Sequence, residues 1–292
     1  MLASRACLSV IAVCSAAAAA PDPDQFNAGL QNRSGLAFSP DGRTAWWAEW
    51  DGKWGSSDRS PSTIYQSTYD GDTWSKPAKA PFSADFSDDD PFVSPDGEWL
   101  YFVSDRPVDD SDEDQDANIW RFSLKGDGQL EHLSVNSPDT EYTPVVTFAG
   151  RLYFASDRDG GFGRGDVYMA EPTDDGFLAP VPLGSSVNSR FGEWNVWISP
   201  GERVLIFESS SRPGNRSKSG DLYFSRHAPE GWAPAIPLES LNSTDSDLLP
   251  RMHPDGETLY YTTAPIGGHA RIVSVKWVNP IGAEKHLKSI TE

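Results

Sequence analysis

One pattern governs this sequence: a tight turn of the Ser-Pro-Asp-Gly type, followed by a pair of aromatic or aliphatic residues, occurs five times. The second copy is the clearest, with Ser94-Pro95-Asp96-Gly97 ahead of Tyr101 and Phe102. The pairs recur every 52 to 55 residues, beginning at Trp46, Tyr101, Tyr153, Ile206 and Tyr260. A fixed period of this length is typical of propellers and solenoids, in which each repeat is one supersecondary unit.

Each repeat contains the signals of four strands. Pro and Gly supply the turn that joins the first two strands, and an alternating segment such as Asn118–Phe122 or Asp221–Phe224 follows as the third. The fourth strands end near Leu133, Leu183 and Leu238. Four antiparallel strands form one propeller blade. We therefore predict an all-β fold, a single β-propeller of five blades, with repeats that start near residues 34, 88, 141, 193 and 247.

Two features of the ring have alternatives: the number of blades and the segment that closes it. Six blades, one of them degenerate, would also fit the repeat. The fifth copy has no clear fourth strand after Trp277, so the ring could close with the segment Phe26–Gln31 or with the tail from Val278 onward. The sequence leaves that choice open. With 38% hydrophobic residues, a chain of 292 residues can bury one large core, and we assign residues 21–292 to the propeller.

The first twenty residues have the layout of a secretory signal. They carry one charge, Arg5, then the apolar stretch Cys7–Cys14 and an alanine run before Pro21. We predict a signal peptide over 1–20, a periplasmic or secreted protein, and no transmembrane segment, since no other apolar run reaches about 18 residues. The segment Ile11–Cys14 partly resembles a bacterial lipoprotein cleavage box, although Val13 is large where a small residue is expected, so lipid attachment at Cys14 is the alternative.

The charge of −19, from 24 basic against 43 acidic residues, argues against nucleic acid as a partner because the surface would repel phosphates. The loop Asp109–Asp116 has Asp at alternate positions, as calcium loops do. An EF-hand loop that began at Asp110 would need Gly at its sixth place and Glu at its twelfth, where this chain has Gln115 and Arg121. We expect a monomer without a cofactor, with calcium at this loop as the alternative.

Alignment of the five first strands places one set of charged residues at the same position: Arg33, Asp88, Glu141, Glu193 and Asp247. The first strand of a blade is innermost, so these residues are candidates for a binding site at the channel mouth, open to a cation or a basic peptide. Trp194 beside Glu193 is the candidate for an exposed aromatic there. In the alternative interpretation the acids are a device of the fold that accepts hydrogen bonds between blades.

Three further sets look structural. The Ser-Asp-Arg elements Ser104–Arg106 and Ser156–Arg158 are expected to connect blades through polar contacts, with Asp166 and Asp221 bound to them or to backbone amides. Asn136, Asn188 and Asn242, which precede the aligned acids, are expected to cap turns.

The motif Ser94-Pro95-Asp96-Gly97 ahead of Leu100-Tyr101-Phe102, then Ser104–Arg106 and Asn118–Trp120, resembles the WD-repeat-like repeat of the TolB-like β-propeller family. The resemblance covers Ser34 to about Trp277 and implies a propeller that binds a protein partner through one face or the central channel. We expect an exported, non-catalytic scaffold with a protein or an envelope glycan as partner.

The alternative function is a carbohydrate-binding or glycoside-hydrolase propeller. There Glu141 and Glu193 would be the acid candidates, with Asp88 or Asp247 as the second carboxylate. Against catalysis, the sequence has no Gly-x-Ser-x-Gly nucleophile elbow and no His-Glu-x-x-His zinc motif.

Overall fold

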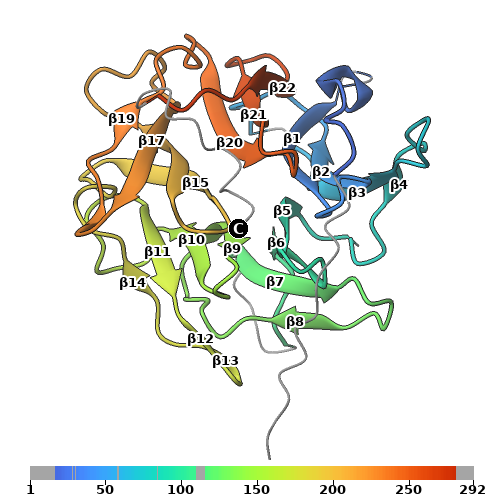
Figure 1. Ribbon diagram of the computed structural model, residues 1–292, viewed down its shortest axis with the longest axis horizontal. Coiled ribbons are helices and arrows are strands. Elements are labelled where there is room, and N and C mark those ends of the chain that lie inside the picture. Colours follow the sequence, from blue (N-terminus) through green and yellow to red (C-terminus); the bar gives the residue numbers. More distant parts are fainter. Residues whose placement is uncertain are drawn as a thin grey trace, which may run out of the picture.

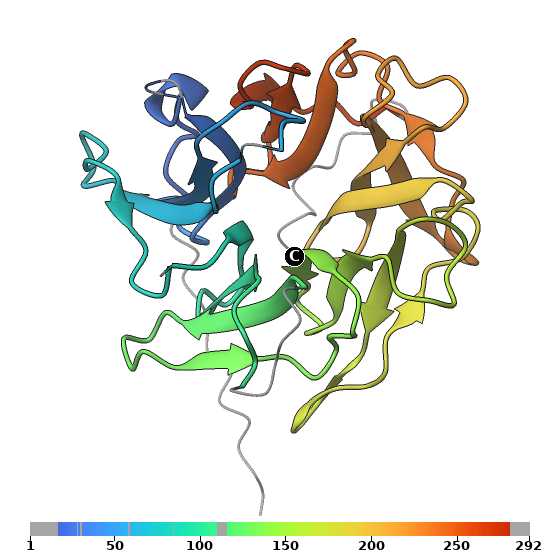
Figure 2. The ribbon, with the colours of Figure 1, turned by 180° about the vertical axis from the view of Figure 1, so that it is seen from behind.

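A computed structural model describes residues 17–27, 29, 31–57, 59–83, 85–109 and 116–280. Five antiparallel sheets stand around a common centre like the blades of a propeller (Figures 1 and 2). The predicted all-β fold with five blades is confirmed, and the only described helix is the short η1 (Pro23–Gln25) ahead of the first blade.

The strands follow one another along each blade. Blade 1 consists of β1 (Asn32–Phe38), β2 (Thr44–Trp50), β3 (Thr63–Thr68) and β4 (Ala78–Lys79). Blade 2 consists of β5 (Asp88–Val93), β6 (Trp99–Ser104), β7 (Asn118–Ser123) and β8 (Leu130–His132). Blade 3 consists of β9 (Glu141–Val146), β10 (Leu152–Ser156), β11 (Asp166–Ala170) and β14 (Val181–Pro182), with a side hairpin of β12 (Pro172–Thr173) and β13 (Gly176–Phe177).

Blade 4 consists of β15 (Gly192–Ile198), β16 (Val204–Ser210), β17 (Asp221–Ala228) and β19 (Ile236–Pro237), and β18 (Gly231–Trp232) pairs with the end of β17. Blade 5 has three strands in the described part of the chain: β20 (Ser246–Met252), β21 (Thr258–Ala264) and β22 (Arg271–Lys276). The first strands contact one another in order round the ring, so β1, β5, β9, β15 and β20 form its inner wall.

Every first strand is interrupted by a β-bulge where its register against the second strand shifts. One residue in each bulge has a positive φ between 45° and 65°, namely Gly35, Asp90, Thr143, Asn195 and Leu249. This left-handed conformation is costly for Thr and Leu, so the surrounding sheet must impose it. A bulge changes the direction in which the neighbouring side chains point. Here the five bulges lie at one level and divide the inner wall into two parts.

One backbone hydrogen bond recurs at all five blade junctions. In each blade the residue two positions before the positive-φ residue donates its N–H to a backbone carbonyl of the preceding blade, at 2.8 to 3.1 Å. That carbonyl lies just before the start of the preceding blade's third strand. The donor and acceptor pairs are Asp88 and Ser62, Glu141 and Ala117, Glu193 and Gly165, Asp247 and Gly220, and Arg33 and Ala270. The last pair joins blade 1 to blade 5, so the ring closes with the same contact as the other junctions.

Closure also uses the segment before β1, although not as a strand. Asn27 accepts a hydrogen bond from the N–H of Ile272 at 3.0 Å and donates to its carbonyl at 2.7 Å. The same pair of bonds ties Asn136 to Ile119, and equivalent pairs occur in blades 3 and 4. These asparagines therefore brace the third strand of their blade rather than cap a turn. Asn27 and the buried ring of Phe26 take this place in blade 5, whereas the tail after residue 280 lies outside the described residues.

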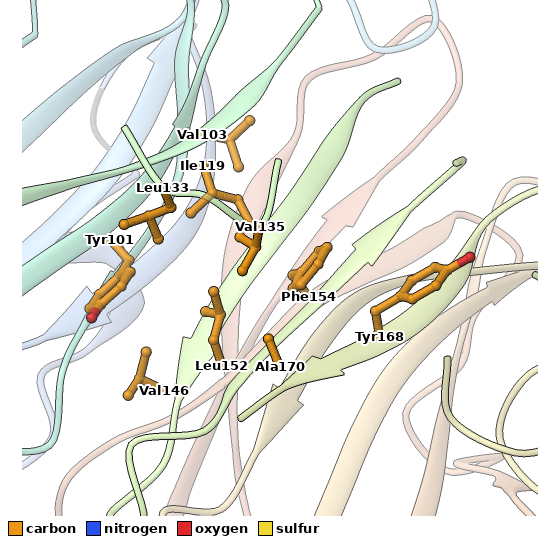
Figure 3. Close-up of a cluster of buried hydrophobic side chains, with 10 residues drawn as sticks. All are labelled: Tyr101, Val103, Ile119, Leu133, Val135, Val146, Leu152, Phe154, Tyr168 and Ala170. Atoms are coloured by element: carbon orange, nitrogen blue, oxygen red, sulfur yellow. The ribbon is translucent and has the colours of Figure 1, made fainter. Parts of the chain in front are cut away.

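The hydrophobic core is divided among the spaces between blades. Figure 3 shows the cluster between blades 2 and 3, in which Val103 and Ile119 of blade 2 face Leu152 and Phe154 of blade 3. Equivalent clusters fill the other junctions. Burial of these apolar surfaces is the main favourable contribution to folding, at about 25 cal/mol per Å². Because the apolar clusters lie between blades, polar groups and cavities remain at the ring centre.

Candidate functional site

The five aligned residues of the sequence prediction occupy equivalent positions, but their side chains are enclosed. Asp88, Glu141 and Glu193 have no exposed surface, and Asp247 and Arg33 are buried as well. Arg33 forms an ion pair with Glu49 at 2.9 Å, and Asp247 accepts a hydrogen bond from the N–H of Ser243 at 2.6 Å.

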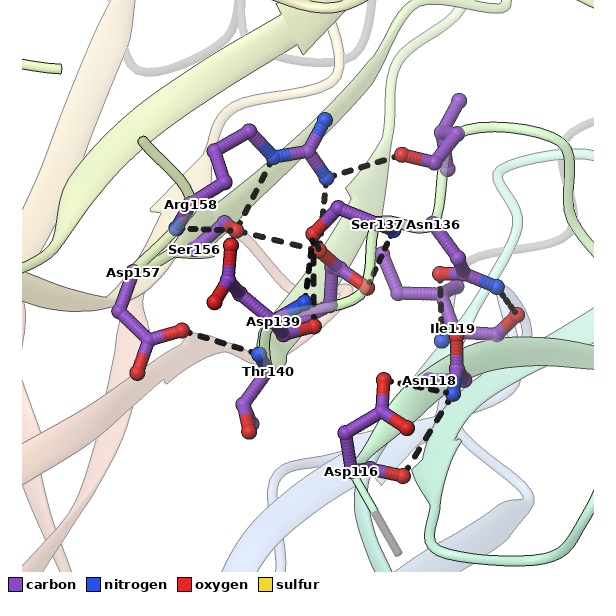
Figure 4. Close-up of polar contacts among 12 residues, drawn as sticks. Asp116, Asn118, Ile119, Asn136, Ser137, Asp139, Thr140, Ser156, Asp157 and Arg158 are labelled. Atoms are coloured by element: carbon purple, nitrogen blue, oxygen red, sulfur yellow. Dashed lines mark hydrogen bonds and ion pairs between the residues drawn. The ribbon is translucent and has the colours of Figure 1, made fainter. Parts of the chain in front are cut away.

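Three of the aligned acids are each bound by the arginine of a Ser-Asp-Arg or Ser-Arg element. Asp88 binds Arg106 at 2.7 Å, Glu141 binds Arg158 at 2.7 Å and Glu193 binds Arg212 at 3.0 Å, and each arginine also donates to a carbonyl at the end of the preceding blade. Figure 4 shows the copy around Arg158, where Ser137 and Ser156 converge on the same cluster.

These contacts assign the aligned acids to the blade junctions. Burial raises the pKa of Glu141 and of Glu193, and hydrogen bonds and the arginine charge counteract that rise. Among the described residues, none of the four acids lines either cavity at the ring centre. The interpretation as a fold device therefore agrees with the geometry, with partners that include side chains of the same blade. Asp166 and Asp221 bind backbone amides, as expected.

The ring centre instead contains two cavities, one on each side of the bulges. The first, which we call the loop-side cavity, has a volume of about 310 Å³ and lies where the first strands begin. Side chains of all five blades line it, including Trp54, Asp89, Tyr142, Trp194, Glu208 and Leu249. Of the six residues predicted from sequence, Trp194 is the one that lines this cavity.

The indole ring of Trp194 occupies space that two glycines leave open. A Cβ atom on Gly165 would lie 2.0 Å from the indole ring, and one on Gly192 would lie 2.3 Å from its Nε1, so any other residue would displace the ring. The indole meets Tyr142 edge to face at a centroid distance of 5.1 Å, and both rings are partly exposed. The cavity therefore has a fixed aromatic wall.

A cation, Arg59, also lines this cavity. Arg59 forms an ion pair with Asp89 at 2.8 Å, donates to Ser62 and stacks over the ring of Trp50 at 4.6 Å. Asp89 keeps a quarter of its side-chain surface exposed. Cation–π stacking and the ion pair orient the guanidinium, so Arg59 and Asp89 present an ordered polar edge to the cavity.

Two buried carboxyl groups complete the lining. Glu208 accepts a hydrogen bond from the amide of Asn195, and burial raises the pKa of Glu208 to about 8, so this carboxyl is protonated at neutral pH. Burial and the charge of Asp89 raise the pKa of Asp90 to about 6. Gly220 gives Glu208 its room, because a Cβ there would lie 2.1 Å from Oε1.

A chain of hydrogen bonds crosses four blades at the level of the bulges. The N–H of Thr143 donates to Asp90 at 3.1 Å, the N–H of Val196 donates to Oγ1 of Thr143 at 3.2 Å, and Nη1 of Arg251 donates to the carbonyl of Val196 at 3.1 Å. Asp90 lines the loop-side cavity and Arg251 lines the cavity on the other side. The belt Asp90-Thr143-Val196-Arg251 thus separates the two cavities.

Sequence reasoning missed Arg59, Asp89, Asp90, Asn195 and Glu208. For some of them the alternation of side chains along a strand was a signal. The residue that follows a buried aligned acid faces the other way, toward the ring centre. The sequence contained no signal for Glu208, which comes from a second strand, or for Arg59, which comes from a loop.

Other expectations from the sequence concern metal binding, the acidic loop, the leader and membrane spans. Within the described ranges no group of three or more His, Cys, Asp or Glu side chains could hold a metal ion. The acidic loop falls largely outside those ranges, at residues 110–115, as do residues 1–16 of the predicted leader. The described helical structure includes no segment with the length and hydrophobicity of a membrane span.

Comparison with solved structures places this architecture. The putative TolB of Agrobacterium tumefaciens superposes with a TM-score of 0.53 at 17% identity, over 84% of this chain and 77% of that one. The chain has a propeller fold similar to that of TolB. TolB of Acinetobacter baumannii gives a TM-score of 0.50 at 15% identity over 84% of this chain, which spans 57% of that protein.

The likeness extends to an enzyme. An α-L-arabinofuranosidase of Lactobacillus brevis gives a TM-score of 0.53 at 12% identity, over 89% of this chain and 95% of that one. Comparison of the sequence with protein-family models and with curated proteins gave no match. At these identities the similarity concerns the fold alone, and the TolB-like resemblance of the repeat is supported at that level.

Proposed function

We propose that this chain is an exported, non-catalytic binding propeller that holds a sugar unit of an envelope glycan in the loop-side cavity. The observation that carries the proposal is the lining itself. Partly exposed rings of Trp54, Tyr142 and Trp194 share one cavity with the hydrogen-bonding groups of Asp89 and Asn195.

This combination suits a carbohydrate. The C–H face of a sugar ring packs on aromatic side chains, while its hydroxyl groups bond to carboxylates and amides. The volume of about 310 Å³ lies at the lower end of small-molecule pockets, so it fits one sugar unit rather than a protein element. The carboxylate of Asp89 and the overall charge of −19 disfavour phosphorylated or sulfated sugars.

The test is calorimetric titration of the full chain with neutral oligosaccharides of two to four units from arabinan, xylan, cellulose and chitin. We expect saturable binding of at least one of them, and a loss of about tenfold or more in Trp194→Ala and in Gly165→Ala, which displaces the indole without removing it. Trp99→Ala, at the start of β6 and outside the lining of both central cavities, and Gly184→Ala, which has open space around it, are matched controls. Failure of all four glycan classes, or equal binding by both cavity variants, would refute the proposal.

Glycoside cleavage is the second candidate, and the protonated state of Glu208 favours it. The acids expected from sequence, Glu141 and Glu193, are enclosed by arginines, whereas Glu208 at neutral pH holds the proton that a general acid gives to a leaving oxygen. Asp89 would be the base that activates water. Release of nitrophenol from aryl glycosides by the native chain, abolished in Glu208→Gln, would establish this activity, and its absence from every aryl glycoside tested would exclude it.

A further inference from the structure

The second cavity at the ring centre, which we call the turn-side cavity, lies where the first strands reach their Pro-containing turns. Its volume is about 260 Å³, and its walls come from all five blades, including Phe38, Phe92, Phe148, Trp197, Met252 and Arg251. Phe148 keeps 57% of its surface exposed at the rim. The cavity is therefore apolar and open, with a single arginine in its lining.

Arg251 is buried without enough partners. It has 3% exposed surface, and its Nη1 donates to the carbonyls of Val196 and Pro250. Its Nε and Nη2 have no hydrogen-bond partner in the part of the chain that the structure describes. Buried guanidinium groups usually bind a carboxylate through two such donors, and an unmet pair costs free energy.

The nearest counter-charge does not complete the site. Asp90 belongs to blade 2, which does not adjoin blade 5, and its charge favours the protonated form of Arg251. No ion pair within 4 Å joins the two among the described residues, and Asp90 accepts a hydrogen bond from Thr143 instead. Burial lowers the pKa of Arg251 to about 10, so the guanidinium remains charged at neutral pH. Burial also lowers the pKa of His253 in the same lining, which leaves Arg251 as its permanent charge.

We propose that the turn-side cavity is a binding site for a small apolar monocarboxylate, whose carboxylate pairs with the guanidinium group of Arg251 and whose hydrocarbon body packs against the rings of Phe38, Phe92 and Trp197. The charge of the arginine and the apolar walls select for this class together. A dianion would bring a second charge into an apolar wall, and a neutral hydrocarbon would leave the guanidinium unpaired. The site lies on the opposite side of the belt from the loop-side cavity and does not depend on the glycan proposal.

The experiment is calorimetric titration of the full chain with octanoate at pH 7, beside octanamide, which has nearly the same shape and no charge. We expect one octanoate per chain, bound about tenfold or more tightly than octanamide, because a hydrogen-bonded charge contributes about 1.5–3 kcal/mol. Arg251→Met should remove this preference for the acid. No binding of octanoate by the native chain, or equal affinity for the two compounds, would overturn the proposal.

Two further variants keep the test decisive if Arg251→Met does not fold. Asp90→Asn keeps the oxygen that accepts from Thr143, suits a positive φ and removes a competing negative charge, so octanoate should bind more tightly. Unchanged or weaker binding in the folded Asp90→Asn chain would contradict a carboxylate site at Arg251. Trp194→Ala should leave octanoate binding unchanged, and a loss there would place octanoate in the loop-side cavity and refute the assignment.

Discussion

Replacement of Arg158 by Met tests the role of the buried ion pairs at the blade junctions. Glu141 has no exposed surface, and after the substitution it would keep only its hydrogen bonds from the hydroxyls of Ser137 and Ser156 and from the N–H of Ser137. The loss of one partner of a buried ion pair costs about 3–5 kcal/mol, since an uncompensated charge remains. At about 2–4 °C per kcal/mol, the melting temperature should fall by roughly 6 to 20 °C.

The cost should depend on pH. Burial already raises the pKa of Glu141, and without Arg158 this pKa rises further above its value in the unfolded chain. The folded variant then holds a proton that the unfolded chain releases, so its stability is greatest below about pH 4, near the unfolded pKa, and falls as the pH rises through the folded pKa. The difference from the native chain should therefore be larger at pH 7 than at pH 5.

The assay is urea unfolding followed by tryptophan fluorescence at both pH values. Arg226→Met, at an exposed site on blade 4, serves as the control and should change stability by no more than about 0.5 kcal/mol. The double variant Glu141→Gln/Arg158→Met should regain part of the loss because no buried charge remains. A loss below about 1 kcal/mol in Arg158→Met, or an equal loss at both pH values, would refute this reasoning.

Two other predictions concern ring closure and the loop-side cavity. Asn27→Ala removes both side-chain bonds to Ile272 and should cost about 1–3 kcal/mol, with faster hydrogen exchange of the Ile272 amide; unchanged exchange would show that Asn27 does not close blade 5. Glu208→Gln should flatten the decline of stability between about pH 4.5 and 8. The native carboxyl is protonated when folded and ionised when unfolded over that window, and identical pH profiles in urea unfolding would rule this out.

The repeat specified most of the architecture. Five in-phase turns and strand pairs can only bury their apolar faces against neighbouring copies, so the period predicted a propeller, and the structure decided for five blades over six. Alignment of the first strands also identified Asp88, Glu141 and Glu193 as equivalent, and in the structure the N–H of each donates the same backbone hydrogen bond to the preceding blade. Their role did not follow from the alignment, since the arginines that enclose them lie 17 to 19 residues away in sequence.

What only the tertiary structure decided is which side chains reach the ring centre. The bulge that sets this direction is occupied by Gly35, Asp90, Thr143, Asn195 and Leu249, which share no residue type, so no local pattern marks it. Glu208 and Arg251 acquire their properties from desolvation and from neighbours on other blades. The sequence by itself therefore determined a propeller and the equivalence of its repeated positions, whereas the structure decided the number of blades and the closure of the ring. The two cavities and their chemistry arise only when the five copies meet, because each cavity wall takes its residues from all of them.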